Sequence, residues 1–154
     1  MRTAIGRIAA AFIVTAVLAA CNRESAAASP DIWSRDGREV SADEVTSYAG
    51  HPHCNWEQAQ FLHVSWPPGT DASDRSETRQ YVRDPEGVLG DEALRRAYQP
   101  DATLPRDAQA TGYTSGSTTL WLAPSDRDTR AYLVTTDPRR VEAWPRVEPP
   151  VGCD

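Results

Sequence analysis

The chain has 154 residues, including 16 basic residues, all arginine, and 22 acidic residues, which give a net charge of −6. That length fits one domain. An acidic surface repels phosphate backbones and anionic lipid head groups, so we expect no nucleic-acid partner and no membrane contact through basic side chains.

The first twenty residues are typical of an export signal. Arg2 and Arg7 give a positive start, and the apolar run 8–18 is too short to span a bilayer as a stable helix. Small residues then lead into Cys21, and "LAAC" (residues 18–21) resembles the lipobox of bacterial lipoproteins. That resemblance implies a signal peptide over 1–20, with cleavage before Cys21 and a lipid on its thiol. The alternative is an ordinary signal peptide followed by a coincidental cysteine.

The mature chain would be more acidic than the precursor. Residues 1–20 contain two arginines and no acidic residue, so their removal leaves 14 basic and 22 acidic residues and a net charge of −8. Residues 21–31 are rich in Ala and Ser and lack apolar periodicity, which predicts a lipidated cysteine with a flexible tether. Residues 32–154 would then form a single extracytoplasmic globular domain.

The first predicted element of that domain is a short helix over 42–49. Ser41 and Glu44 have the spacing of a capping box, Val40 and Val45 that of a hydrophobic staple, and Gly50 supplies a stop.

Strand signals dominate the rest of the chain. Residues 59–66 alternate, with Leu62, Val64 and Trp66 on one side. Residues 79–84 read as a strand, and 91–98 fit either a short helix or an irregular strand. Three apolar runs with short connections come next, at 118–124, 130–136 and 140–147. We expect an α+β fold: a mainly antiparallel β-sheet with one or two short helices, a C-terminal three-stranded meander and one disulfide.

The disulfide prediction concerns Cys54 and Cys153, which remain once Cys21 is assigned to lipid. Thiols outside the cytoplasmic membrane tend to be oxidised, and two cysteines allow one intramolecular pairing. The bond would tie down the chain end and close a loop of about 100 residues, which the chain-entropy estimate values at about 4.7 kcal/mol.

The alternative use of "HPHC" (residues 51–54) is a metal site. His51 and His53 would project to the same side of an extended segment, and Cys54 and His63 would complete a four-ligand set suited to zinc or copper. Pro52 restricts how the segment wraps an ion, and this use of Cys54 leaves Cys153 unpaired. We therefore predict neither a metal nor another cofactor, with His51, His53 and His63 as the alternative metal ligands.

No motif identifies a reaction. The chain has no G-x-S-x-G elbow, phosphate loop or dinucleotide fingerprint, and residues 71–77 fail the EF-hand pattern at two positions. Catalytic residues are therefore unknown from sequence, although a serine triad using one of the three histidines stays open.

Several stretches, among them "CNWEQAQFLH", "QYVRDPEGVL", "LWLAPSD" and "VEAWPR", together with "LAAC", resemble small secreted lipoproteins of high-GC Gram-positive bacteria. The resemblance covers most of residues 48–154 and departs from the family at Asn55, where glycine is expected. It implies a lipid-anchored domain on the extracytoplasmic face of the cell membrane, with a two-cysteine bridge and no transferable catalytic residues.

The sequence thus favours a non-enzymatic, lipid-anchored binding or structural module of the cell envelope. Its partners would be the membrane, through the lipid on Cys21, and an envelope protein or small ligand. An envelope hydrolase that uses a histidine and a metal-binding lipoprotein that uses His51 and His53 are the alternatives.

Overall fold

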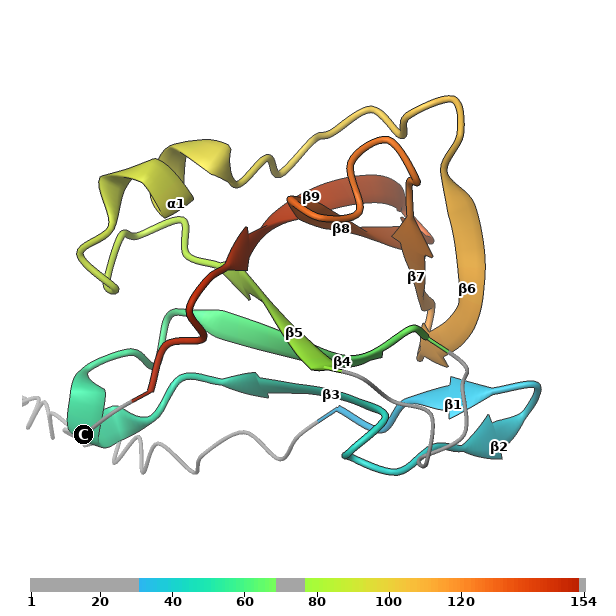
Figure 1. Cartoon of the computed structure of the whole chain (residues 1–154), viewed down its shortest axis with the longest axis horizontal. Helices are drawn as coiled ribbons and strands as arrows, with labels where there is room; N and C mark the ends of the chain where they lie inside the picture. Colours follow the sequence, from blue (N-terminus) through green and yellow to red (C-terminus); the bar gives the residue numbers. More distant parts are fainter. Residues whose placement is uncertain (1–30, 69–76, 153–154) are drawn as a thin grey trace, which may run out of the picture.

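The computed structural model describes residues 31–68 and 77–152 (Figure 1). In this part of the chain nine strands form one antiparallel sheet in the order β2-β1-β6-β7-β8-β9-β5-β4-β3. The strands are β1 (Ser34–Arg35), β2 (Arg38–Glu39), β3 (Val45–Ala49), β4 (Gln60–Trp66), β5 (Glu77–Arg83), β6 (Gln109–Ser115), β7 (Thr118–Leu122), β8 (Arg130–Thr136) and β9 (Arg139–Val147). The helical elements are a 3₁₀ turn, η1 (Pro52–Cys54), and an α-helix, α1 (Glu92–Ala97).

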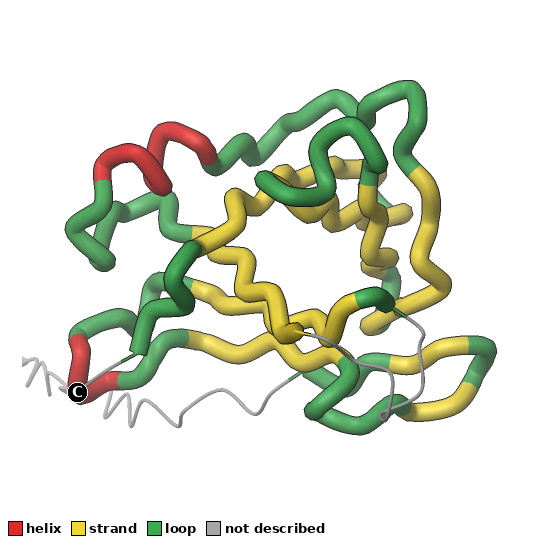
Figure 2. The backbone as a smooth tube through the Cα atoms, viewed as in Figure 1, coloured by secondary structure: helices red, strands yellow, loops and turns green. Residues whose placement is uncertain are grey.

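The sheet curls round until its two ends meet (Figure 2). Asp31, just before β1, forms an isolated antiparallel bridge with Ser47 in β3. The Asp31 backbone N–H donates to the Ser47 carbonyl at 3.1 Å, and the Ser47 hydroxyl donates to Asp31 Oδ2 at 2.6 Å. Nearby, the Tyr113 hydroxyl in β6 donates to Glu44 Oε1 at 2.6 Å. These contacts connect the β1–β6 side of the sheet to the β3 side.

The alternation of residues along each strand places one face inside the curl. In β4, Leu62 and Val64 are fully buried in the main core, and Trp66 packs against it. These residues meet side chains from strands far away in the sequence, because all inward positions of a closed sheet converge. The buried members of this core are Trp33, Val45, Leu62, Val64, Tyr81, Tyr98, Tyr113, Leu120, Leu122, Ala131 and Trp144.

Two smaller apolar clusters lie on the outer face. One groups Phe61, Val82 and Val147 with Trp56 and Val151, so the final described segment packs beside the segment that comes after η1. Figure 1 shows this segment (red) running from β9 down to η1. The other cluster packs Tyr132 and neighbouring strand residues against the connection that precedes β6.

The predicted helix over 42–49 is wrong. Glu44 and Val45 both donate their backbone N–H groups to the carbonyl of Ser41, so a turn begins where the capping signal lies. It does not continue, because residues 45–49 pair with β4 in register from Val45↔Val64 to Ala49↔Gln60. β-branched and aromatic side chains in this segment suit a sheet, and burial of Val45 and Ser47 outweighs the local capping preference.

Other predicted elements are confirmed. The run 59–66 contains β4 with the expected inward set, and the strand predicted at 79–84 is β5. The ambiguous segment 91–98 contains α1, capped by Asp91, whose carboxylate accepts from the N–H groups of Ala93 and Leu94. The last three runs contain β7, β8 and β9, and β8 pairs antiparallel with both of the others.

The mainly antiparallel sheet of the predicted fold is therefore confirmed. Regular helix is limited to α1 and η1 within residues 31–68 and 77–152, so mainly β describes the fold better than α+β. No helix in this part of the chain is long and apolar enough to cross a membrane.

Candidate functional site

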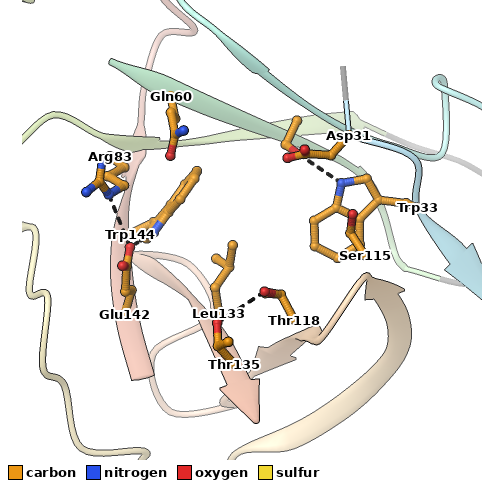
Figure 3. A pocket seen from close by; sticks show the side chains of 11 residues that line it. Asp31, Trp33, Gln60, Arg83, Ser115, Thr118, Leu133, Thr135, Glu142 and Trp144 are labelled. Atoms are coloured by element: carbon orange, nitrogen blue, oxygen red, sulfur yellow. Dashed lines mark hydrogen bonds and ion pairs between the residues drawn. The ribbon is translucent and has the colours of Figure 1, made fainter. Parts of the chain in front are cut away.

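A pocket of about 310 Å³ opens at one end of the closed sheet (Figure 3). Its lining comes from inward-facing residues of strands on all sides of the curl and from residues just before β1. The lining residues are Asp31, Trp33, Ser47, Gln60, Arg83, Ser115, Thr118, Leu133, Thr135, Glu142 and Trp144. Such a concave site with a few convergent polar groups is the usual form of a small-ligand site.

One wall of the pocket carries a negative group, Asp31. The buried indole N–H of Trp33 donates to the Ser47 hydroxyl at 2.9 Å, and that hydroxyl donates to Asp31 Oδ2 at 2.6 Å. Asp31 is exposed, and its Oδ1 atom has no hydrogen-bond partner among the described residues. The relay therefore orients the carboxylate and leaves one oxygen available.

The opposite wall carries an ion pair between Arg83 and Glu142. Arg83 Nε lies 3.3 Å from Glu142 Oε2, which also accepts from the Trp144 indole N–H at 3.0 Å and the Tyr98 hydroxyl at 3.2 Å. Arg140 reaches Oε1 at 3.2 Å. Glu142 thus accepts two hydrogen bonds and pairs with two arginines, whereas Nη1 and Nη2 of Arg83 contact no acceptor within the described chain.

Tyr98 supports this wall from the core side. Burial and the neighbouring Glu142 carboxylate raise the pKa of Tyr98, so its phenol stays protonated and keeps donating to Glu142. Its oxygen also accepts from Arg83 Nε at 3.2 Å. The tyrosine therefore holds the arginine and the glutamate in one arrangement.

The remaining lining is polar at the rim and apolar on the floor. Thr118 and Thr135 share a hydrogen bond of 3.1 Å. The side chains of Gln60 and Ser115 have no hydrogen-bond partner among the residues described. Leu133, Trp33 and Trp144 form the floor, and the two indoles are almost completely buried, with 2% and 4% exposed.

The three histidines lie outside this pocket. His51 and His53 are exposed at η1, where their rings stack with centroids 4.7 Å apart and His51 Nδ1 accepts the backbone N–H of His53. The segment forms a 3₁₀ turn and not the extended chain on which the metal alternative depends. His63 lies in β4, facing outward, and across residues 31–68 and 77–152 no three His, Cys, Asp or Glu side chains form a metal-binding group.

His63 is held in a hydrogen-bonded cluster on the outer face. Its Nε2 is hydrogen-bonded to the Tyr48 hydroxyl at 3.0 Å and lies 2.7 Å from Gln80 Nε2. Burial lowers the pKa of His63, so the neutral imidazole is favoured. Tyr48, His63 and Gln80 are thus engaged with one another, and none of them lines the pocket at the end of the sheet.

The predicted cysteine roles fall largely outside the described residues. Cys54 is half-buried in η1, and Cys21 and Cys153 both lie outside the described range. The Cys54–Cys153 pairing is therefore not shown and stays a prediction. The signal peptide over 1–20, the lipidation of Cys21 and most of the tether also lie outside. Asp31, assigned to the end of the tether, is hydrogen-bonded to β3.

Sequence reasoning missed the pocket residues, although a signal for them exists. In β9, Glu142 occupies an inward position between the apolar residues Val141 and Ala143, two residues before the inward Trp144. In β5, Arg83 comes two residues after Tyr81 on the same face. A charged residue on the inward face of a strand is costly unless it is paired or functional, so these positions were identifiable.

No family model, curated protein or solved structure matches this chain. The pocket is accordingly interpreted from its own geometry.

Proposed function

We propose that the protein is a lipid-anchored, extracytoplasmic module of the bacterial cell envelope that binds a small polar ligand in this pocket. The observation that carries the proposal is the convergence of Asp31, Arg83, Gln60 and Ser115 on one hollow, each with hydrogen-bonding capacity that the described chain leaves unused. Groups oriented in this way, on strands of a closed sheet, are positioned before a ligand arrives.

The pocket chemistry suits binding better than catalysis. A hydrolase of the predicted kind needs a histidine beside its substrate, and His51, His53 and His63 line none of this pocket. Glu142 is held by two arginines, an indole and a phenol, and such a carboxylate is poorly placed to exchange protons. The metal alternative has no three-ligand group in the described part of the chain to support it.

The proposed location of the protein at the membrane rests on the sequence around Cys21. The lipobox-like "LAAC" supports a lipid on this cysteine, and the acidic mature chain makes the lipid the membrane contact. Expression of the full chain with a radiolabelled fatty acid tests this point. We expect label and membrane fractionation for the wild type and loss of both for Cys21→Ala. Membrane retention of the unlabelled variant would contradict the anchor.

A pocket-filling variant tests the binding proposal. Thr135 lies in the pocket, whereas the next residue, Thr136, is exposed, so Thr135→Trp and Thr136→Trp form a matched pair. We expect some members of a panel of small polar compounds to raise the melting temperature of the wild type and Thr136→Trp but not of Thr135→Trp. Ser115→Trp, at the strand end, fills the same space if Thr135→Trp folds poorly. Binding that survives both pocket-filling variants would refute the site.

A further inference from the structure

We infer that the ligand is a small zwitterion, which carries one ammonium and one carboxylate group, with free amino acids as the simplest class. The inference rests on the proposed function and deepens it. It derives from Arg83 and Asp31, two charged residues that lie on opposite sides of the pocket, with apolar side chains between them (Figure 3).

Arg83 is the group for the ligand carboxylate. Its Nε is used by Glu142 and Tyr98, which fix the plane of the guanidinium. Nη1 and Nη2 have no acceptor among the described residues, and 28% of the side chain is exposed. A guanidinium offers paired donors that match the two oxygens of a carboxylate, and it stays charged at every physiological pH.

Asp31 is the group for the ligand ammonium. Ser47 occupies Oδ2, while the backbone bridge to β3 holds the residue at the pocket edge. Oδ1 of the same carboxylate is left as an acceptor for the ligand. An ammonium group has three donors and no acceptor, so this oxygen and the Ser115 hydroxyl, which lies on the same side of the pocket, can accept from it (Figure 3).

The charge pattern disfavours ligands with only one charge. Glu142 pairs with both Arg83 and Arg140, so these three side chains together carry one net positive charge, whereas Asp31 has no ion pair among the described residues. A ligand with one charge would desolvate the other group without pairing it, and such an unpaired group costs binding free energy.

The shape of the pocket disfavours a neutral sugar. Aromatic recognition of a sugar ring needs an open indole face, and the indoles of Trp33 and Trp144 are only 2% and 4% exposed. The volume of about 310 Å³ corresponds to about ten waters at ~30 Å³ each, which suits one amino acid and not a long peptide.

The two indole N–H groups provide separate reporters for the two charged groups. The Trp33 indole N–H donates to Ser47, which donates to Asp31, so its signal responds to binding at Asp31. The Trp144 indole N–H donates to Glu142, which pairs with Arg83, so its signal responds to binding at Arg83. In the ¹H–¹⁵N spectrum of the purified chain, we expect an amino acid to shift both signals. Its deaminated analogue, an acid, should shift the Trp144 signal more, and its decarboxylated analogue, an amine, the Trp33 signal. Trp56, Trp66 and Trp121 line the outer face or the opposite end and should not shift.

Affinity measurements complete the test. Among the twenty amino acids, we expect at least one to bind, and its acid and amine analogues to bind about tenfold or more weakly, because each loses a charge-assisted contact. In Asp31→Asn, the amino acid should no longer bind more tightly than its acid analogue. In Arg83→Lys, the advantage of the amino acid over its amine analogue should become smaller. Neither comparison on the wild type requires a variant that folds.

Two failures can be told apart. In the first case, neutral compounds bind, shift both indole signals and lose binding in Thr135→Trp, whereas amino acids do not bind. The zwitterion inference is then wrong, and the pocket remains a binding site. If no compound of any charge is blocked by Thr135→Trp, the proposed function fails together with the inference.

Discussion

Gln80 and Val151, which lie 71 residues apart, are joined by a pair of hydrogen bonds. The Val151 backbone N–H donates to Gln80 Oε1 at 2.8 Å, and Gln80 Nε2 donates to the Val151 carbonyl at 3.5 Å. This pairing holds the end of the chain against the outer face of β5. Because Val151 also packs in the cluster that contains Trp56, the last described residues lie beside the segment that carries Cys54.

The first prediction concerns the Cys54–Cys153 bridge. We expect the oxidised chain to be two hydrogens lighter than the reduced chain, and reduction to lower the free energy of unfolding by about 2–4 kcal/mol. Urea denaturation with and without reductant measures the loss, and intact mass measures the bond. Cys54→Ser is the control, since reductant should not change its unfolding midpoint. Equal unfolding midpoints for the oxidised and reduced wild type would show that the bridge does not stabilise the fold.

The second prediction concerns acid and His63. Burial lowers the folded-state pKa of His63 below its ordinary value, so folding favours the neutral ring. That stability is complete above the ordinary value of about 6.5 and is lost as the pH falls below it, with a slope of at most about 1.4 kcal/mol per pH unit for one proton. Protonation also places a hydrogen on the Nε2 atom that faces Gln80 Nε2, and Gln80 is held in orientation by Val151.

Melting temperatures between pH 7.5 and pH 5 test this dependence. We expect His63→Gln to flatten the curve and His53→Gln, a change at an exposed histidine, to leave it as in the wild type. An identical slope in His63→Gln would contradict the assignment to His63. Asp107 and Asp126 do not account for a slope in this range, because hydrogen bonds lower the pKa of both from an ordinary value of 3.8, and the stability they contribute is lost only as the pH falls below that value.

The third prediction concerns the closure of the sheet at Ser47. Its hydroxyl accepts from the buried Trp33 indole and donates to Asp31, so Ser47→Ala leaves the indole N–H without an acceptor. We expect a loss of about 1–3 kcal/mol in the free energy of unfolding, measured by urea denaturation. Thr46→Ala, at the neighbouring outward position, should cost less. An equal loss for Thr46→Ala and Ser47→Ala would mean that the hydrogen bonds of Ser47 to Trp33 and Asp31 add no stability of their own.

The fourth prediction concerns the glycine before η1. A Cβ atom at Gly50 would lie 2.6 Å from the Trp56 Cβ atom and would overlap the Trp56 carbonyl oxygen. We expect Gly50→Ala to cost about 1–3 kcal/mol by overpacking and to displace the turn that carries Cys54. Gly152→Ala is the matched control, because its Cβ meets nothing within 4 Å. Neutral behaviour of Gly50→Ala in thermal denaturation would contradict the packing of Trp56.

Local patterns predict the strands of this protein well because their residues alternate strictly. Leu62, Val64 and Trp66 identify the inner face of β4 without any knowledge of its neighbours. The capping box at Ser41 predicts a helix start, and the turn does form, but the conformation of residues 45–49 is decided by their pairing with β4. Such pairing is a contact between distant segments, and a local signal does not contain it.

The pocket could not be predicted from spacing for the same reason. Asp31, Arg83 and Glu142 are separated by more than fifty residues at each step, and only closure of the sheet places them around one hollow. The histidines attracted attention because they are adjacent in sequence, whereas the fold places them at an exposed turn and on an outer face. The signal that the sequence did contain was the unusual inward position of each charged strand residue.

Asp31 also has a mechanical position in the molecule. It lies ten residues beyond Cys21 in the sequence. If Cys21 is anchored in lipid, a pull from the membrane reaches the domain first at Asp31, whose bridge to Ser47 is one of the contacts that close the sheet. Such a pull would weaken the closure of the sheet beside the pocket, and a ligand bound to Asp31 would stabilise that closure.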